Sequence, residues 1–243
     1  MHPKLIPLAK DSIHGASFLL REAADILLRH CHNYDELQQL LQDLPKTQPW
    51  MAPLFNLAKY VQESPKPCEA IEEFLAKEAQ EKEELIQRAC WQIEDGERIL
   101  THSHSSLVRE VLLQKRVDVL LTESRPKREG TELYRILRKT GIKATLIIDG
   151  AAPYFVRECD RVLLGADGIG DFGLVHKIGT YPIALAAKEA GVEVDVLATS
   201  ARFWPRGFAL PPQPHKPCNE IEPDSRCLNY YFDITPASLY QLL

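Results

Sequence analysis

The spacing of hydrophobic residues changes near Gly96 and divides the sequence into two parts. In the first part, apolar residues recur at intervals of three and four, which predicts amphipathic helices over residues 12–30, 35–44, 53–61 and 68–95. In the second part, short apolar runs alternate with helical segments. The runs predict strands over residues 98–102, 118–122, 144–149, 161–165 and 193–199. The segments between them predict helices over residues 107–114, 131–140, 153–158 and 175–190.

This pattern predicts an α/β protein with a small all-helical N-terminal domain, residues 1–95, followed by a parallel-sheet domain, residues 96–243. Strands that alternate with helices form a parallel sheet covered on both faces. In such sheets ligands bind at the carboxyl ends of the strands. The candidates for a functional site are therefore the polar residues just past each strand, at positions 101–105, 123–126, 149, 167 and 199–202.

Charge and hydropathy exclude two classes of partner. The chain has 29 Lys and Arg against 34 Asp and Glu, a net charge of −5, so no basic excess indicates a nucleic acid or an anionic membrane. The longest stretch without charged residues, Thr47 to Ala58, contains two prolines, whereas a membrane-spanning helix needs about 20 mostly apolar residues. The N-terminus has Pro3, Pro7 and Lys10 where a signal peptide would be apolar, which predicts a cytoplasmic protein.

The cysteine and histidine residues give no metal-binding pattern. The six cysteines include no Cys-x-x-Cys pair, which predicts free thiols. His30, Cys31 and His32 are adjacent, but consecutive helical residues point about 100° apart and cannot converge on one ion. His102 and His104 lack further residues at ligand spacing and are expected to line a site wall. We therefore expect neither a metal nor a cofactor.

A glycine-rich segment offers a second interpretation. Gly168 to Gly173 matches the pattern Gly-x-Gly-x-x-Gly, which in dinucleotide-binding proteins opens a helix. Here the next helix is expected only after Gly173, which favours a turn that lets the backbone approach another group. The hypothesis of a dinucleotide-dependent oxidoreductase rests on these glycines alone.

Four ordered segments carry a more specific pattern. They are Ile99–Ser105 (ILTHSHS), Glu123–Pro126 followed by Glu129-Gly130, Asp149–Ala152 (DGAA), and Gly165–Ile169 (GADGI) with Lys177–Thr180 (KIGT). Together they resemble the family that joins the alpha, beta and delta regulatory subunits of translation initiation factor 2B with methylthioribose-1-phosphate isomerase and ribose-1,5-bisphosphate isomerase. The resemblance extends more loosely to Ile13–Ala16 and Phe232–Pro236.

The resemblance implies a helical domain on a Rossmann-like domain, usually dimeric or larger, with a phosphorylated sugar or a nucleotide bound in the cleft between them. In the isomerases of this family, the site pairs a cysteine in a Thr-His-Cys segment with the aspartate of Gly-Ala-Asp. Asp167 matches the aspartate, which would act as the acid that opens the sugar ring. Such an acid stays protonated near pH 7 only when burial raises its pKa. Ser103 stands in place of the cysteine, and a hydroxyl is a poor proton carrier without a neighbouring base.

The resemblance also assigns residues to substrate binding. Lys177 matches a phosphate-binding lysine expected near the start of a helix, where backbone N–H groups favour an anion. Three departures replace family residues: His176 for asparagine, Glu129 for glutamine and His14 for arginine. Glu129 would repel a phosphate dianion, and Arg125 could compensate for it. The candidate substrate-binding residues are His14, Gly15, Arg125, Glu129, Gly130, Asp149 and Lys177.

Two hypotheses of function remain open. One is an isomerase of an aldose 1-phosphate, with Asp167 and Ser103 as the catalytic residues. The other is a non-catalytic regulatory or scaffold protein that senses a sugar phosphate or nucleotide, as implied by the initiation-factor subunits. We also expect a homodimer or a higher homo-oligomer, because Phe203, Trp204 and Phe208 lie in a Pro-rich stretch that no predicted core includes.

Overall fold

The computed structural model describes all 243 residues and divides into two compact units. Unit 1 comprises Met1–Glu83, Asp167–Asp171 and Thr199–Pro211; unit 2 comprises Glu84–Ala166, Phe172–Ala198 and Pro212–Leu243. The predicted α/β class with a helical N-terminal part is confirmed. None of the helices has both the length and the apolar character that crossing a bilayer requires.

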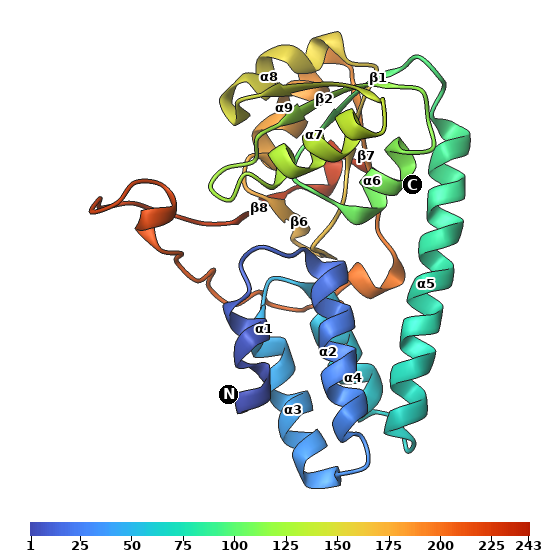
Figure 1. The fold of residues 1–243 in the computed structure, drawn as a ribbon, viewed down its shortest axis with the longest axis vertical. Helices are drawn as coiled ribbons and strands as arrows, with labels where there is room; N and C mark the ends of the chain where they lie inside the picture. Colours follow the sequence, from blue (N-terminus) through green and yellow to red (C-terminus); the bar gives the residue numbers. More distant parts are fainter. The chain divides into compact units, whose positions relative to one another are not determined.

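Unit 1 is a bundle of helices around a leucine core (Figure 1). Its helices are α1 (Ile6–Lys10), α2 (Ala16–His30), α3 (Tyr34–Thr47), α4 (Ala52–Gln62) and the first part of α5 (Pro67–Gln92), and it also holds the short strand β5 (Gly168–Gly170). The side chain of Asn33 caps α3 by accepting the N–H of Glu36, and Pro53 fits the first turn of α4 because its missing N–H would have no helical partner. The predicted helices of this part therefore form, with ends shifted by a few residues.

The aromatic residues expected at a dimer contact belong partly to this core. Trp204 is only 6% exposed, and its ring stacks on Phe208. A Cβ on Gly168 would overlap the Trp204 ring, so glycine is needed where β5 passes under it. The expectation that no core includes these aromatics is therefore wrong for Trp204, because residues 199–211 belong to the helical unit, whereas Phe203 is exposed.

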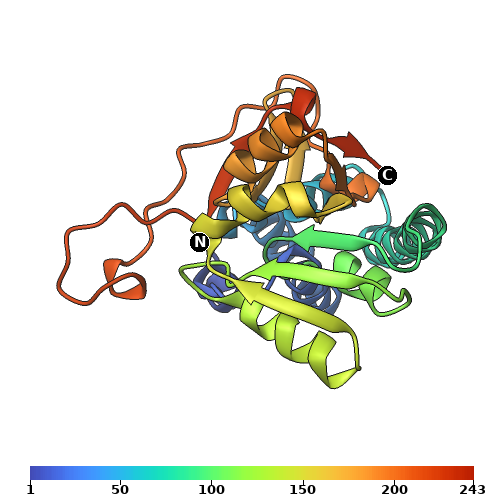
Figure 2. The same ribbon diagram turned by 90° about the horizontal axis from the view of Figure 1, so that it is seen from above.

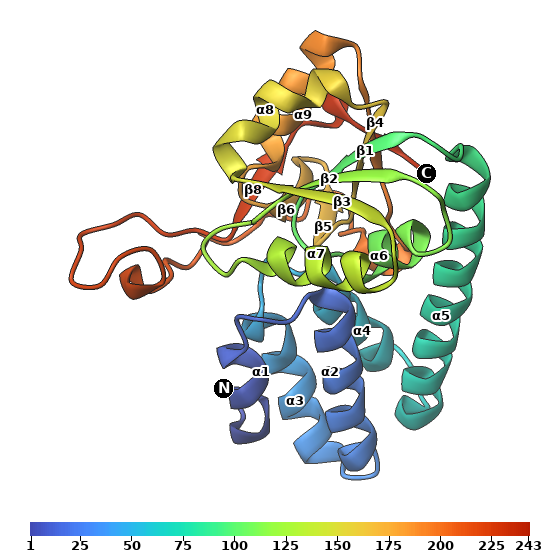
Figure 3. The same cartoon turned by 45° about the horizontal axis from the view of Figure 1, so that its top comes forward.

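Unit 2 contains a six-stranded parallel sheet in the order β3-β2-β1-β4-β7-β9 (Figures 2 and 3). The strands are β1 (Arg98–Thr101), β2 (Asp118–Thr122), β3 (Lys143–Ile147), β4 (Arg161–Leu164), β7 (Glu193–Val196) and β9 (Gln241–Leu242). This is the doubly wound order of dinucleotide-binding folds, in which the chain reverses direction across the sheet between its first and fourth strands. The Rossmann-like parallel sheet is therefore confirmed.

Helices cover both faces of the sheet. Ile99, Val119 and Leu163 pack on one face with the end of α5 and with α6 (Ser106–Leu112) and α7 (Glu129–Lys139). On the other side, α8 (Ala152–Phe155) contacts α9 (Thr180–Ala190), which contacts β7 (Figure 2). Strands buried on both faces are continuous apolar runs, which explains why the sequence showed them clearly.

The helix predicted over residues 175–190 is wrong in its first part. Residues Gly173–Lys177 form strand β6, which pairs antiparallel with β8 (Phe232–Thr235). Gly179 then turns the chain with a φ of 105°, and α9 begins at Thr180. The apolar pattern continues from β6 into α9 without a break. The local sequence therefore does not show that residues 173–177 form a strand, because this depends on pairing with β8, 55 or more residues later.

The prediction of free thiols is also wrong for four of the six cysteines. Cys31 pairs with Cys68 inside unit 1, and Cys218 pairs with Cys227 inside unit 2, whereas Cys90 and Cys159 are free. Cys31 and Cys68 are 37 residues apart in sequence. They meet because one follows the end of α2 and the other lies in the first turn of α5.

Candidate functional site

The loops after the first two strands of the sheet form the centre of the candidate site in unit 2. Ser103 follows β1, and Ser124 follows β2, and both have left-handed backbones with φ of 71° and 63°. Such conformations are uncommon for residues other than glycine and are typical of functional loops. The backbone N–H of Ser103 donates to Oγ of Ser124 over 2.8 Å. This hydrogen bond therefore holds the two loops next to each other at the carboxyl edge of the sheet.

Asp149 holds the second loop in place. Its carboxylate accepts the backbone N–H of Ser124 over 2.7 Å and that of Arg125 over 2.6 Å. Bonds to a charged acceptor are stronger than those between neutral groups, so one side chain fixes the turn after β2 from the end of β3. Asp149 thus shapes the loop that carries Arg125, whose guanidinium donates to the carbonyl of Ile221 over 3.2 Å.

A lysine–glutamate pair joins three separate segments of unit 2. Nζ of Lys177, at the end of β6, lies 2.7 Å from Oε1 of Glu129, at the start of α7. The same Oε1 accepts the hydroxyl of Ser103 over 3.2 Å, and Oε2 is buried without a hydrogen-bond partner. The Lys177 side chain is only 6% exposed, and that of Glu129 is 20% exposed. Charges so buried are retained where they are paired, and they gather at functional sites.

Gly130 is needed for this arrangement. A Cβ at position 130 would overlap the carbonyl oxygen of Thr122 at the end of β2. Glycine therefore lets the first turn of α7 approach the strand, which brings Glu129 to Lys177 and Ser103. Gly165, after β4, is needed for a similar steric reason, because a Cβ there would overlap the side chain of Ser105.

Further cations surround the ring of Tyr231. Nζ of Lys216, Lys177 and Lys127 lies 4.7, 5.0 and 6.0 Å from the ring centre. Glu220 pairs with Lys127 over 2.6 Å and accepts the Tyr231 hydroxyl over 2.7 Å. Burial lowers the pKa of the Lys216 ammonium. Three ammonium groups against the carboxylates of Glu129 and Glu220 leave this cluster with a net positive charge.

His102 has a structural role in unit 2. Its Nε2 lies 2.8 Å from the carbonyl of Ile178 and its Nδ1 lies 2.6 Å from the hydroxyl of Thr122. A carbonyl can only accept, so Nε2 carries the proton and the neutral ring accepts from Thr122. Burial lowers the pKa of His102, which favours this neutral form. The ring therefore ties the loop after β1 to the segment between β6 and α9.

The N-terminus of α9, expected to favour a phosphate, is bonded to a carboxylate of the chain itself. Oδ2 of Asp233 accepts the N–H groups of Gly179 over 2.8 Å and Tyr181 over 3.1 Å. Lys177 precedes this helix by three residues and belongs to β6. The prediction that Lys177 lies near the start of a helix is therefore confirmed, and the pairing of β8 with β6 brings the Asp233 carboxylate to the N–H groups there.

The remaining predicted site residues lie in unit 1. Asp167 is half-buried and its backbone carbonyl accepts the N–H of Ala52 over 3.0 Å. His14 pairs with Asp11 over 2.7 Å and stacks on Phe18, and Gly15 begins α2 as its N-cap. Because they belong to the other unit, their roles in ligand binding stay predictions.

Unit 1 contains a buried ion pair of its own, which the sequence did not predict. Arg202, only 3% exposed, donates to the hydroxyl of Ser17 over 2.7 Å and lies 3.9 Å from Glu78. The charge of Asp167 also acts on this guanidinium. Burial raises the pKa of Glu78. The signal available was weak, because Arg202 was only one of several polar residues after an expected strand.

The glycine-rich segment does not form a dinucleotide loop. Gly168–Gly170 is strand β5 and Gly173 begins strand β6, with no helix starting among these glycines. Gly173 has a φ of 119°, and a Cβ there would overlap the carbonyl of Thr235. The turn interpretation is therefore the correct one.

The chain is thus an α/β protein that combines a doubly wound parallel sheet with a helical N-terminal unit. Residues 11–243 match the model of the initiation factor 2 subunit family, and the chain belongs to that family.

Two curated relatives carry different names. A putative translation initiation factor eIF-2B subunit 2-like protein of Pyrococcus horikoshii is 33% identical over 248 residues, covering 94% of this chain and 88% of that protein. The ribose 1,5-bisphosphate isomerase of Archaeoglobus fulgidus is also 33% identical, over 260 residues, covering 95% of this chain and 83% of the isomerase. Sequence similarity alone therefore does not separate the regulatory from the enzymatic branch.

Solved structures agree with the fold. The crystal structure of translation initiation factor eIF-2B from P. horikoshii matches with a TM-score of 0.88 and 32% identity, covering 98% of this chain and 92% of that one. The 5-methylthioribose 1-phosphate isomerase of the same organism matches with a TM-score of 0.73 and 21% identity, covering 98% and 80%. The second likeness shows the shared fold.

The buried Asp233 carboxylate makes the stability of the chain depend on pH. Burial raises its pKa from 3.8 to about 6, although the N–H bonds act in the opposite direction. The folded chain then binds more protons than the unfolded chain between these pH values, so the free energy of unfolding falls as pH rises from 4 to 6. At about 1.4 kcal/mol per pKa unit, the loss approaches about 3 kcal/mol.

Asp233→Asn is expected to remove this loss. Urea unfolding of the variant and of the natural chain at several pH values should give curves that converge at low pH and separate above pH 6, with the variant gaining. Asp224→Asn, at an exposed position, is the matched control and should follow the natural chain. Parallel curves for Asp233→Asn and the natural chain would show that the carboxyl titrates normally.

Proposed function

We propose that this protein binds a phosphorylated sugar at the carboxyl edge of the unit 2 sheet, with the Lys177 ammonium as the group that recognises phosphate. One observation carries the proposal: Lys177 is buried and its ammonium is paired over 2.7 Å with Glu129 at that edge. Burying a charged pair costs desolvation energy that apolar packing would avoid. A pair kept at the ligand-binding edge of a doubly wound sheet is best explained by recognition of an anion.

The surroundings of Lys177 support an anionic ligand. Lys127 and Lys216 approach the same Tyr231 ring, so the local charge is positive. The relatives support a sugar phosphate in particular, because two of them, from Archaeoglobus fulgidus and Methanocaldococcus jannaschii, are named ribose 1,5-bisphosphate isomerase.

Binding requires Lys177 to change partners. In the structure the ammonium is neutralised by Glu129, which would also repel a phosphate dianion at short range. The ligand must therefore displace the Glu129 carboxylate from Lys177. Affinity is then set by the difference between the lysine–phosphate and the lysine–glutamate interactions, and the protein acts as a sensor with moderate affinity.

A second candidate function is the isomerisation of an aldose 1-phosphate to a ketose phosphate. It is favoured by one contact, the 3.2 Å hydrogen bond from the Ser103 hydroxyl to Glu129. A serine alone is a poor proton carrier, but a carboxylate beside it can accept its proton. In this scheme Asp167 protonates the ring oxygen, and Ser103 with Glu129 moves the proton between C2 and C1.

The assembly and the cellular location stay proposals. A solved tetrameric eIF2B-beta2-delta2 complex from C. thermophilum shares the fold at 21% identity. We propose that this chain forms a homodimer or a larger homo-oligomer, and that it acts in the cytoplasm. Ile148 and Tyr154, which are 66% and 63% exposed, are apolar positions in unit 2 available for such contacts.

Replacing Glu129 and replacing Lys177 should change the affinity for the sugar phosphate in opposite directions. Glu129→Gln frees the ammonium and removes the repulsion, so the affinity for ribose 1,5-bisphosphate should rise at least about tenfold, or about 1.4 kcal/mol. Lys177→Met should lower it about thirtyfold, or about 2 kcal/mol. Isothermal titration calorimetry measures both.

Two controls accompany this test. Lys139→Met removes an exposed positive charge from the end of α7 and should leave affinity unchanged. The double variant Glu129→Gln/Lys177→Met avoids leaving a buried carboxylate unpaired, so it reports binding in a chain that is not destabilised by that charge. Unchanged affinity in both Lys177 variants would place the phosphate elsewhere.

Ser103→Cys separates sensor from isomerase. A thiol ionises near pH 8.5 and carries protons better than a hydroxyl, so if the other residues of this scheme are competent, turnover of ribose 1,5-bisphosphate should rise at least about 100-fold over the natural chain. Ser103→Ala, which removes the hydroxyl, is the matched control. If none of the three chains converts a sugar that all three bind, the isomerase hypothesis is excluded and the sensor proposal stands.

A further inference from the structure

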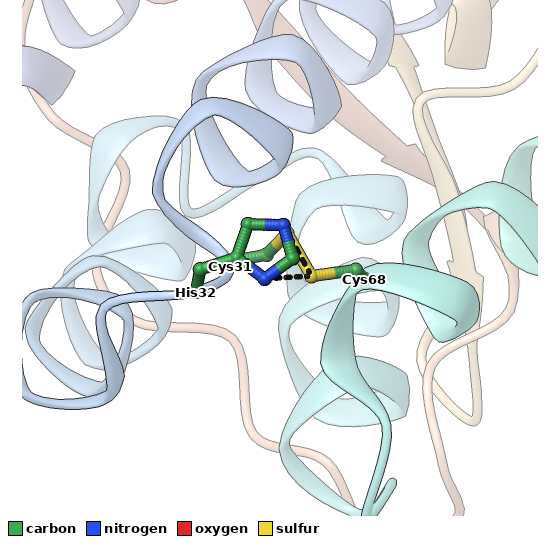
Figure 4. A group of neighbouring side chains, drawn as sticks. All are labelled: Cys31, His32 and Cys68. Carbon is green, nitrogen blue, oxygen red and sulfur yellow. Dashed lines mark hydrogen bonds between the residues drawn. A yellow bond between two sulfur atoms is a disulfide. The ribbon is translucent and has the colours of Figure 1, made fainter.

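Two cysteines and a histidine gather at one point of unit 1 (Figure 4). Cys31 and His32 follow the end of α2, so the 100° spacing of helical residues that argued against a shared ion does not apply to this pair; Cys68 is the second residue of α5. Nδ1 of His32 lies 3.6 Å from Sγ of Cys68. One ligand atom from each of the three residues lies within 4.8 Å of the others. The fold thus brings Cys68 to the adjacent residues Cys31 and His32, which lie 37 and 36 residues before it in the sequence.

We propose that Cys31, His32 and Cys68, once the disulfide is reduced, bind one zinc ion, with water as the fourth ligand. Two thiolates and an imidazole are a set that zinc prefers, with Zn–S bonds of about 2.3 Å and Zn–N bonds of about 2.0 Å. Tetrahedral geometry with these bonds places the ligand atoms about 3.5 to 3.8 Å apart. Rotation of side chains that already lie within 4.8 Å reaches this spacing.

The positions of the three residues fit such a site. Cys68 lies in the first turn of α5, a helix of 26 residues, whose N-terminal N–H groups favour negative charge on its sulfur. His32 is exposed, so water has access to the fourth position, while Cys31 is buried and anchors the site to the bundle. A structural disulfide needs only its two sulfur atoms. The His32 imidazole beside them is not needed for that role, and it supports a metal site.

Oxidation and metal binding exclude each other at this site. A dithiol reductant gives two electrons and two protons to the Cys31–Cys68 disulfide, which becomes two thiols while the reductant becomes a disulfide. Zinc then displaces the two thiol protons and forms two Zn–S bonds and one bond to His32. The oxidised chain has no thiolate to offer, so the same residues hold either an S–S bond or a metal ion.

The test is a titration of the full chain with zinc. The chain is reduced with a phosphine, freed of reductant under anaerobic conditions, and titrated against a chromophoric chelator; cobalt replaces zinc in a parallel titration. We expect one metal ion per reduced chain, a thiolate-to-cobalt charge-transfer absorption, and no binding to the oxidised chain. Cys90→Ser and the double variant Cys218→Ser/Cys227→Ser remove cysteines outside the site and should bind like the natural chain.

Two variants decide the assignment. His32→Gln changes an exposed residue and leaves the disulfide able to form, so its fold can be verified in the oxidised state. It should weaken zinc binding at least about tenfold, since even indirect partners of metal ligands contribute that much. Cys68→Ser should remove the stoichiometric site. Zinc binding that both variants retain, equal binding by the oxidised chain, or no binding by the reduced chain overturns the proposal.

Discussion

The ion pair between Lys177 and Glu129 is the interaction on which the site depends. It joins the end of β6 to the start of α7, and through Glu129 it reaches the Ser103 hydroxyl after β1. A buried ammonium cannot be left without a partner at acceptable cost, so in the absence of an external anion the protein supplies its own carboxylate. Gly130 makes the pair possible, because any side chain there would force α7 away from β2.

Two further carboxylates of unit 2 bond backbone N–H groups of the chain itself. Asp149 bonds the N–H groups of the turn after β2, and Asp233 bonds those at the start of α9. Carboxylates of the chain therefore take the places where a ligand could be held by backbone N–H groups. What an incoming phosphate can still recruit is the cluster of ammonium groups around Tyr231, once Glu129 is displaced. Because Glu129 must first be displaced, we expect this site to bind phosphate less tightly than the same site without Glu129.

The sequence predicted five of the six parallel strands, because buried strands such as β2 are continuous apolar runs with clear ends; it did not predict the two-residue strand β9. It failed where long-range pairing decides the structure: the local pattern predicts helix over β6, because the strand that pairs with it, β8, lies 55 or more residues later. The Cys31–Cys68 bond was missed for the same reason. Lys177, Glu129 and Ser103 were named from the motifs, but their contact was not, because spacing along a chain does not give distances between loops. The domain boundary between residues 95 and 96 stays a prediction.

The most direct measurement is a crystal structure of the chain with ribose 1,5-bisphosphate. The account predicts a phosphate oxygen within hydrogen-bond distance of Lys177 Nζ and a Glu129 carboxylate that has moved away from the ammonium. A sugar bisphosphate bound elsewhere, with the pair between Lys177 and Glu129 intact, would contradict it.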